Sequence, residues 1–116
     1  MADIKFTSNV NDILSALENG KRNALTAIGA SAETHTKDNI TADKLVDTGR
    51  LRNSISHSVD GEAAYIGTNV EYAPYLELGT KKITAHHYLK RAVTEHQDEY
   101  KRLTAQAVQS AINNSQ

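Results

Sequence analysis

Apolar and small side chains recur at steps of three and four residues from Asn9 to Ala32. This spacing places them on one face of a helix. It predicts a long N-terminal helix that Asn9 caps, with Gly20 and Gly29 weakening its interior. The stripe consists of Val10, Ile13, Leu14, Leu17, Ala24, Leu25, Ile28 and Ala32.

A polar segment of mixed charge, residues 36–48, comes next, and its composition favours a loop. Serines then alternate with larger side chains over residues 54–59, and a second run that carries Tyr and Ile covers residues 63–68. Asp60 and Gly61 between these runs suit a turn, so the pattern predicts a β-hairpin. The serines expected on its solvent face are Ser54, Ser56 and Ser58.

Residues 71–78 have apolar positions at helical spacing, with Pro74 early in the segment and Gly79 placed to end it. A second long apolar stripe covers residues 89–111 and predicts one C-terminal helix, with His96 on its apolar face. The order of elements predicts an α+β fold: a long N-terminal helix, a small antiparallel sheet built on a central hairpin, a short helix and a long C-terminal helix.

The composition favours one thin-cored domain. The chain has 116 residues, of which 39% are hydrophobic, with no Trp and one Pro. We expect a single domain over residues 1–116, with flexible ends at residues 1–8 and 113–116 unless partners hold them. Neighbouring subunits could supply the burial that a thin core lacks. The formal charge of -1 and the lack of a long apolar run favour a soluble protein with no membrane contact.

Asp47 is the one residue with the look of a catalytic group. Retroviral-type aspartic proteases present their carboxylate in an Asp-Thr-Gly sequence after an apolar residue, as residues 46–49 do here, and pair two chains to form the site. The basic segment 50–52 and the long helices at both ends do not suit that family. Thr48 as the cap of a short helix explains the same residues without chemistry. A dimeric protease stays as the alternative enzymatic hypothesis.

No other segment has the pattern of a catalytic, cofactor-binding or metal site. The chain has no Cys, no nucleophile elbow and no glycine-rich phosphate loop. The histidines lack the spacing of a metal motif, and two of them are adjacent in sequence. We therefore expect no enzymatic activity, cofactor or metal. The five histidines are His35, His57, His86, His87 and His96.

Two sets of residues are candidates for contacts with partners. Tyrosine suits surfaces that are apolar at one end and wet at the other, so a subunit interface is expected around the short helix. Four cations in loop-like segments would form a charged belt if many subunits formed a ring, and they could otherwise serve a small nucleic-acid-binding module. The interface candidates are Tyr72, Tyr75, Leu76, Leu78 and Tyr88, and the cations are Arg50, Arg52, Lys81 and Lys82.

Three motifs occur in order along the middle of the chain. They read Val-Asp-Thr-Gly-Arg-Leu-Arg-Asn-Ser-Ile at residues 46–55, Ile-Gly-Thr-Asn at 66–69 and Glu-Tyr-Ala-Pro-Tyr-Leu-Glu-Leu-Gly-Thr at 71–80. Together they resemble the neck or tail-completion family of Hong Kong 97 type and many other siphophages and prophages. The chain departs from that family at residues 86–92, where the usual proline-rich Pro-Phe-Leu-x-Pro-Ala motif is missing.

This resemblance implies a structural virion protein made in the host bacterial cytoplasm. Such proteins form rings, commonly sixfold, around the DNA channel in the neck or at the head-proximal end of the tail. The implied partners are other copies of the chain, neighbouring neck, tail-terminator or tail-tube proteins, and in passing the DNA. A closed ring of identical subunits needs two different complementary patches on each subunit. The long helices and the hairpin are the candidates for these patches.

Overall fold

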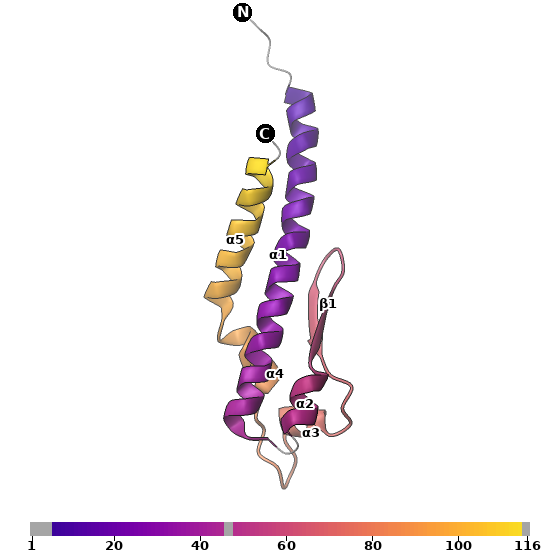
Figure 1. Ribbon diagram of the computed structural model, residues 1–116, viewed down its shortest axis with the longest axis vertical. Coiled ribbons are helices and arrows are strands. Elements are labelled where there is room, and N and C mark those ends of the chain that lie inside the picture. The colour runs from indigo at the N-terminus through magenta and orange to yellow at the C-terminus, as the bar shows by residue number, and fades with distance from the viewer. Residues whose placement is uncertain (1–5, 46–47, 115–116) are drawn as a thin grey trace, which may run out of the picture.

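The computed structural model describes residues 6–45 and 48–114, and it confirms the predicted α+β class (Figure 1). Residues 6–8 and 113–114, which were expected in flexible ends, belong to helices, and the remaining terminal residues lie outside the described part. The elements are α1 (Phe6–Asp43), α2 (Thr48–Ser54), β1 (Ser56–Val59), β2 (Ala64–Gly67), α3 (Ala73–Leu78), α4 (Tyr88–Thr94) and α5 (Gln97–Asn114).

Helix α1 is longer than predicted at both ends. It begins at Phe6, so Asn9 lies inside the helix and does not cap it, and it continues through most of the expected loop to Asp43. The prediction of a loop failed because polar residues dominate that segment, whereas Thr36 and Ile40 are fully buried in the structure. Thr36 satisfies its hydroxyl within the helix by donating to the carbonyl oxygen of Ala32, 2.7 Å away. With 38 residues, α1 is about 57 Å long and sets the length of the molecule.

Helix α5 runs back alongside α1, and small side chains let the two helices approach closely (Figure 1). A Cβ atom added at Gly20 would lie 2.8 Å from the Cα of Val108. At Gly29 it would lie 2.8 Å from the ring of His57, which belongs to the hairpin. The two glycines that were expected to weaken the helix are therefore points where neighbouring elements pack closely against it.

The predicted hairpin forms, and its register pairs Ser56 with Gly67 and Val59 with Ala64. Asp60 closes the turn, because its side chain accepts hydrogen bonds from the backbone of residues 62 and 63. Ser56 and Ser58 are exposed as expected. Ser54 was predicted wrongly: it is the last residue of α2, half-buried, and donates to the carbonyl oxygen of Leu51.

The predicted single C-terminal helix is divided into α4 and α5 by a turn at residues 95–96. His96 therefore lies at the junction and not on a continuous apolar stripe. The hydroxyl of Tyr100 donates to the carbonyl oxygen of Ala92, one of the last carbonyls of α4. This bond satisfies a helix-end acceptor and joins α5 to the end of α4.

The larger apolar side chains gather at one end of the rod, where the C-terminal half of α1 meets α2, α3 and α4. The rest of the α1–α5 pair is packed mainly through small residues, including Ala16 and Ala24. In the described ranges, no helix has the length and apolar character needed to cross a membrane. The core residues are Ile40, Leu45, Leu51, Ile55, Val70, Ala73, Leu76 and Tyr88.

The close approach at Gly20 predicts opposite effects for two similar substitutions. Gly20→Ala should lower the free energy of unfolding by about 1–2 kcal/mol, because the new methyl group meets the backbone of α5. Gly49→Ala, where the Cβ meets nothing within 4 Å, should raise it by about 0.5–1 kcal/mol through helix propensity. Urea denaturation followed by circular dichroism checks both values, and a neutral or stabilising Gly20→Ala would contradict the packing described.

Candidate functional site

The first and third motifs are joined by an ion pair between α2 and the start of the third motif. Arg50 donates two hydrogen bonds to Glu71, from Nη1 to Oε1 at 3.1 Å and from Nη2 to Oε2 at 2.8 Å. The Arg50 hydrogen bond lowers the pKa of the Glu71 carboxyl below its ordinary value. The same guanidinium lies 5.5 Å from the ring centroid of Tyr72. Because both ionic groups are largely exposed, this pair orients the two segments more than it stabilises them.

The second motif is joined to the first through Thr68. Its hydroxyl is hydrogen-bonded to that of Ser54 and also accepts from the backbone N–H of Val70. Since Ser54 donates to Leu51, Thr68 is the donor between the two hydroxyls. The three motifs that are separate in sequence therefore form one bonded unit, which we call the motif unit (residues 48–55 and 66–80).

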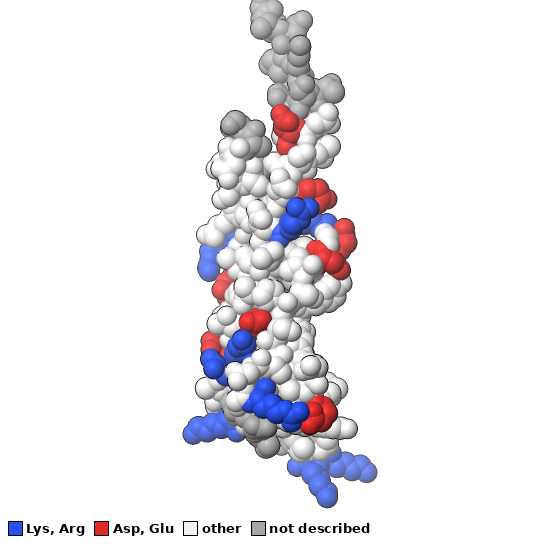
Figure 2. All heavy atoms as spheres, turned by 45° about the vertical axis from the view of Figure 1, so that its right-hand side comes forward, with Lys and Arg blue, Asp and Glu red and all other residues white. Residues whose placement is uncertain are grey.

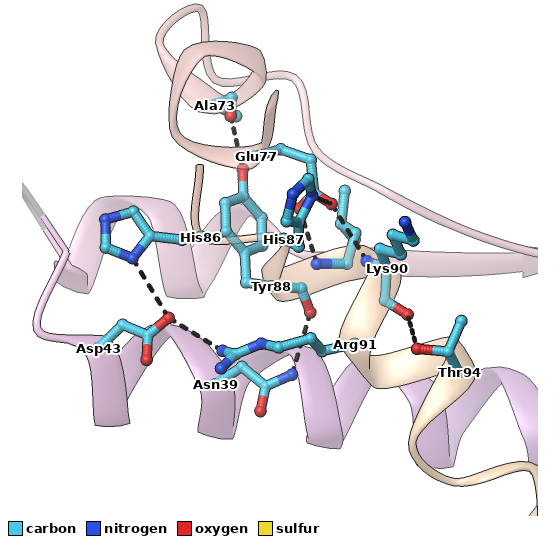
Figure 3. Close-up of polar contacts among 11 residues, drawn as sticks. Asn39, Asp43, Ala73, Glu77, His86, His87, Tyr88, Lys90, Arg91 and Thr94 are labelled. Atoms are coloured by element: carbon cyan, nitrogen blue, oxygen red, sulfur yellow. Dashed lines mark hydrogen bonds and ion pairs between the residues drawn. The ribbon is translucent and has the colours of Figure 1, made fainter. Parts of the chain in front are cut away.

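Glu77 of α3 caps α4 from outside that helix (Figure 3). Its Oε1 accepts from the backbone N–H of Leu89 at 2.8 Å, and its Oε2 accepts from that of Lys90 at 3.1 Å. His87, at the N-cap position, has φ = 50° and its side chain makes no capping bond. The carboxylate thus replaces a local cap and binds the free N–H groups of the first turn. This fixes α4 relative to α3.

Tyr88 is fully buried and connects three helices (Figure 3). Its hydroxyl donates to the carbonyl oxygen of Ala73 at 2.8 Å, and its own carbonyl accepts from the side chain of Asn39 at 3.0 Å. Burial raises the pKa of the phenol to about 12, so the hydroxyl stays protonated and able to donate. Leu76, with 6% exposure, lies in the same core. The prediction that Tyr88 and Leu76 face a partner is therefore wrong, because the chain itself buries both.

Three large, exposed apolar side chains lie around α3, and we call them the α3 tip: Tyr75, Leu78 and Ile83. Tyr75 and Leu78 are 57% and 71% exposed. The loop after α3 folds back on it, with φ = 80° at Gly79 and a backbone hydrogen bond from Thr80 to Ile83. Tyr72 is half-buried beside Arg50. The structure thus leaves Tyr75 and Leu78 as the open interface candidates, with Tyr72 at their margin.

Basic side chains project at the end of the rod that carries the motif unit (Figure 2). Arg52, Lys81 and Lys82 are exposed there, the two lysines in the loop that follows α3. Arg50 differs from them, because it is engaged with Glu71. Contact of these residues with DNA or with an acidic partner stays a prediction.

All five histidines lie within 4.0 Å of a carboxylate, which the sequence pattern did not reveal. In three cases, His35, His57 and His86, the pair joins α1 to another part of the chain. The carboxylate pKa values of Glu99 and Glu33 are lowered, chiefly by the hydrogen bonds from His35 and His57 respectively. The pairs are His35–Glu99, His57–Glu33, His86–Asp43, His87–Glu77 and His96–Glu99.

Two of these pairs share one carboxylate. His35, His96 and Glu99 come together from α1, the turn after α4 and the first turn of α5. His35 and His96 are too distant in sequence for spacing alone to associate them. The available signal was the His96-x-x-Glu99 interval, which puts both side chains on one face when it is helical.

Asp47, the residue of the protease hypothesis, lies outside the described residues, as does Val46. Helix α2 begins at Thr48, where the sequence predicted a helix start. No family model, curated protein or solved structure matches this chain.

Removing the Tyr88 hydroxyl should lower the free energy of unfolding, because a fully buried hydrogen bond is lost. We expect Tyr88→Phe to cost about 1 kcal/mol and the exposed control Tyr75→Phe to change stability by less than about 0.5 kcal/mol. Urea denaturation measures both, and equal effects of the two substitutions would contradict this role of Tyr88.

The raised pKa of Tyr88 predicts a loss of stability at alkaline pH. An unfolded tyrosine loses its proton near pH 10, whereas Tyr88 in the folded chain keeps it until about pH 12. The stabilisation is therefore present below pH 10 and is lost as the pH rises towards 12. Denaturation midpoints measured across this range should fall less steeply in Tyr88→Phe, and parallel curves would count against the assignment.

Proposed function

We propose that this chain is a structural virion protein of a long-tailed bacteriophage. In this proposal it is a ring subunit at the head–tail interface that completes the tail or joins it to the head. The observation that carries the proposal is the motif unit. The three segments that resemble the neck and tail-completion family lie together, bonded through Arg50–Glu71 and Ser54–Thr68. The three segments that follow one another in the sequence thus form one unit in the fold.

A closed ring needs two unlike patches on each subunit, and two apolar surfaces are available for this role. The first is the α3 tip. The second is a hollow of about 350 Å³ between α1, β2, α4 and α5. We propose that the α3 tip of one subunit enters the hollow of the next. The apolar lining of the hollow includes Ile28, Ala32, Ala64, Ile66, Leu89 and Val93.

The chemistry of both surfaces fits this pairing. The hollow is lined mainly by apolar side chains, and Leu78 and Tyr75 offer an aliphatic and an aromatic group to fill it. Burying side chains that are more than half exposed in the free subunit would favour association through the hydrophobic effect. Each subunit would keep its own core intact, because Leu76 and Tyr88 already face inward.

The basic side chains at the end of the rod that carries the motif unit would face the DNA channel or a neighbouring protein. Arg52, Lys81 and Lys82 would be repeated around the ring, where they could meet an acidic neighbouring neck, tail-terminator or tail-tube protein, or the DNA as it passes. The role proposed for the chain involves no catalytic residue, cofactor or metal. Its proposed location is the virion, in the neck or at the head-proximal tail end, after assembly in the host bacterial cytoplasm.

Polar substitutions at the α3 tip should prevent assembly without unfolding the subunit. We expect the double variant Tyr75→Ser, Leu78→Ser to stay monomeric at concentrations at which the unchanged chain forms rings, as measured by light scattering after gel filtration. Its melting temperature should change little, since both side chains are exposed. Leu14→Ser, at a site 56% exposed on the far half of α1, is the control and should still assemble. Assembly of the double variant would contradict the interface.

A phage that lacks this chain tests the role itself. We expect filled heads and tails that fail to join, or tails with defective ends, in electron micrographs of the lysate. Supplying the unchanged chain from a plasmid should restore infectious particles, and the double variant should not. Normal infectious particles without the chain would refute the proposed function.

A further inference from the structure

One cluster of side chains has a geometry that the proposed function does not use. His35 Nε2 lies 2.6 Å from Glu99 Oε2, and His96 Nδ1 lies 3.9 Å from the same oxygen. One ligand atom from each of the three residues lies within 4.8 Å of the other two. Two imidazoles and a carboxylate therefore lie close together beside α1, where α5 begins.

We propose that His35, His96 and Glu99 bind a divalent transition-metal ion of the Zn²⁺ class, which fastens α5 to α1. Two histidines and one carboxylate form a recognised Zn²⁺ donor set, with the fourth position left for water. Imidazole nitrogen favours Zn²⁺ and its neighbours over Mg²⁺ or Ca²⁺, which prefer oxygen ligands. The ligands come from segments far apart in sequence, so the ion would stabilise the packing of these two helices.

Ser31 provides the support that a metal-binding carboxylate usually has. Its hydroxyl donates to Glu99 Oε1 at 2.9 Å, which leaves Oε2 directed at the two histidines. Hydrogen bonds of this kind orient a ligand and commonly contribute a factor of about 10–100 to metal affinity. The side chains of His35, His96 and Glu99 are 23%, 32% and 29% exposed, so an ion can reach them without unfolding the chain.

An ordinary ion pair would explain only part of this arrangement. The pair needs one imidazole, whereas here a second imidazole is stacked on the first and faces the same oxygen. The rings are parallel within 5°, with centroids 3.5 Å apart.

A shared ion about 2.0–2.1 Å from both nitrogens cannot lie in two parallel ring planes at this separation. Metal binding therefore requires at least one ring to turn out of the stack.

Zn²⁺ titration of the full chain, followed by native mass spectrometry and calorimetry, tests the proposal. We expect one ion per chain and, at about a hundredfold excess over the dissociation constant, a rise in melting temperature of about 10 °C. Co²⁺ should give the visible absorption of a low-symmetry site. His96→Gln should weaken Zn²⁺ binding by at least about a hundredfold.

His86→Gln is the matched control, because that histidine faces Asp43 outside the cluster, and it should bind as the unchanged chain does. Ser31→Ala should weaken binding about tenfold while keeping one ion per chain. Glu99→Gln is a second ligand variant in case His96→Gln fails to fold, as judged by circular dichroism. Absence of binding at about 100 µM Zn²⁺, or unchanged binding by a folded ligand variant, would overturn the proposal. The proposed ring assembly does not depend on whether the chain binds Zn²⁺.

Discussion

The hydrogen bond from the buried Tyr88 hydroxyl to the Ala73 carbonyl oxygen fixes the part of the molecule on which its other surfaces depend. Through this bond and the Asn39 contact to its carbonyl, one residue positions α1, α3 and α4 together. Glu77 then caps α4 from α3, and the loop between these helices is bound to α3 by backbone hydrogen bonds. The outward direction of the α3 tip follows from these inward contacts.

The remainder of the chain is built on a different principle. Along α1 and α5, close approach of small side chains takes the place of a core of large ones, as the contact of Gly20 with Val108 shows. Such packing gives a long, narrow molecule, with shorter extents of 23 and 22 Å. It also leaves apolar side chains exposed on the N-terminal half of α1.

The sequence was most informative where local chemistry decides the structure. Asp60 and Gly61 identified the hairpin turn, and Pro74 with Gly79 marked the bounds of α3. It was least informative where tertiary contacts decide. Residues 36–43 are helical with Thr36 and Ile40 buried, and the turn at residues 95–96 is spanned by the hydrogen bond from Tyr100 to Ala92.

The candidate sites follow the same division. The motif residues could be identified along the chain, but their bonds to one another required the fold. Leu76 and Leu78 are two positions apart in one short helix, and only the packing shows that the first is buried and the second exposed. The cluster of His35, His96 and Glu99 depends on how α5 lies against α1, which no interval in the sequence specifies.

Cross-linking between subunits tests the central claim, a head-to-tail ring in which the α3 tip enters the hollow of the next subunit. The chain has no cysteine, so Leu78→Cys and Val93→Cys each introduce a single thiol at an exposed position. After mild oxidation of an assembled mixture of the two variants, the account predicts disulfide-linked pairs that contain one chain of each kind. Either variant oxidised on its own should give no disulfide-linked dimers. Assembled rings without mixed pairs, or equal cross-linking of each variant with itself, would contradict the account.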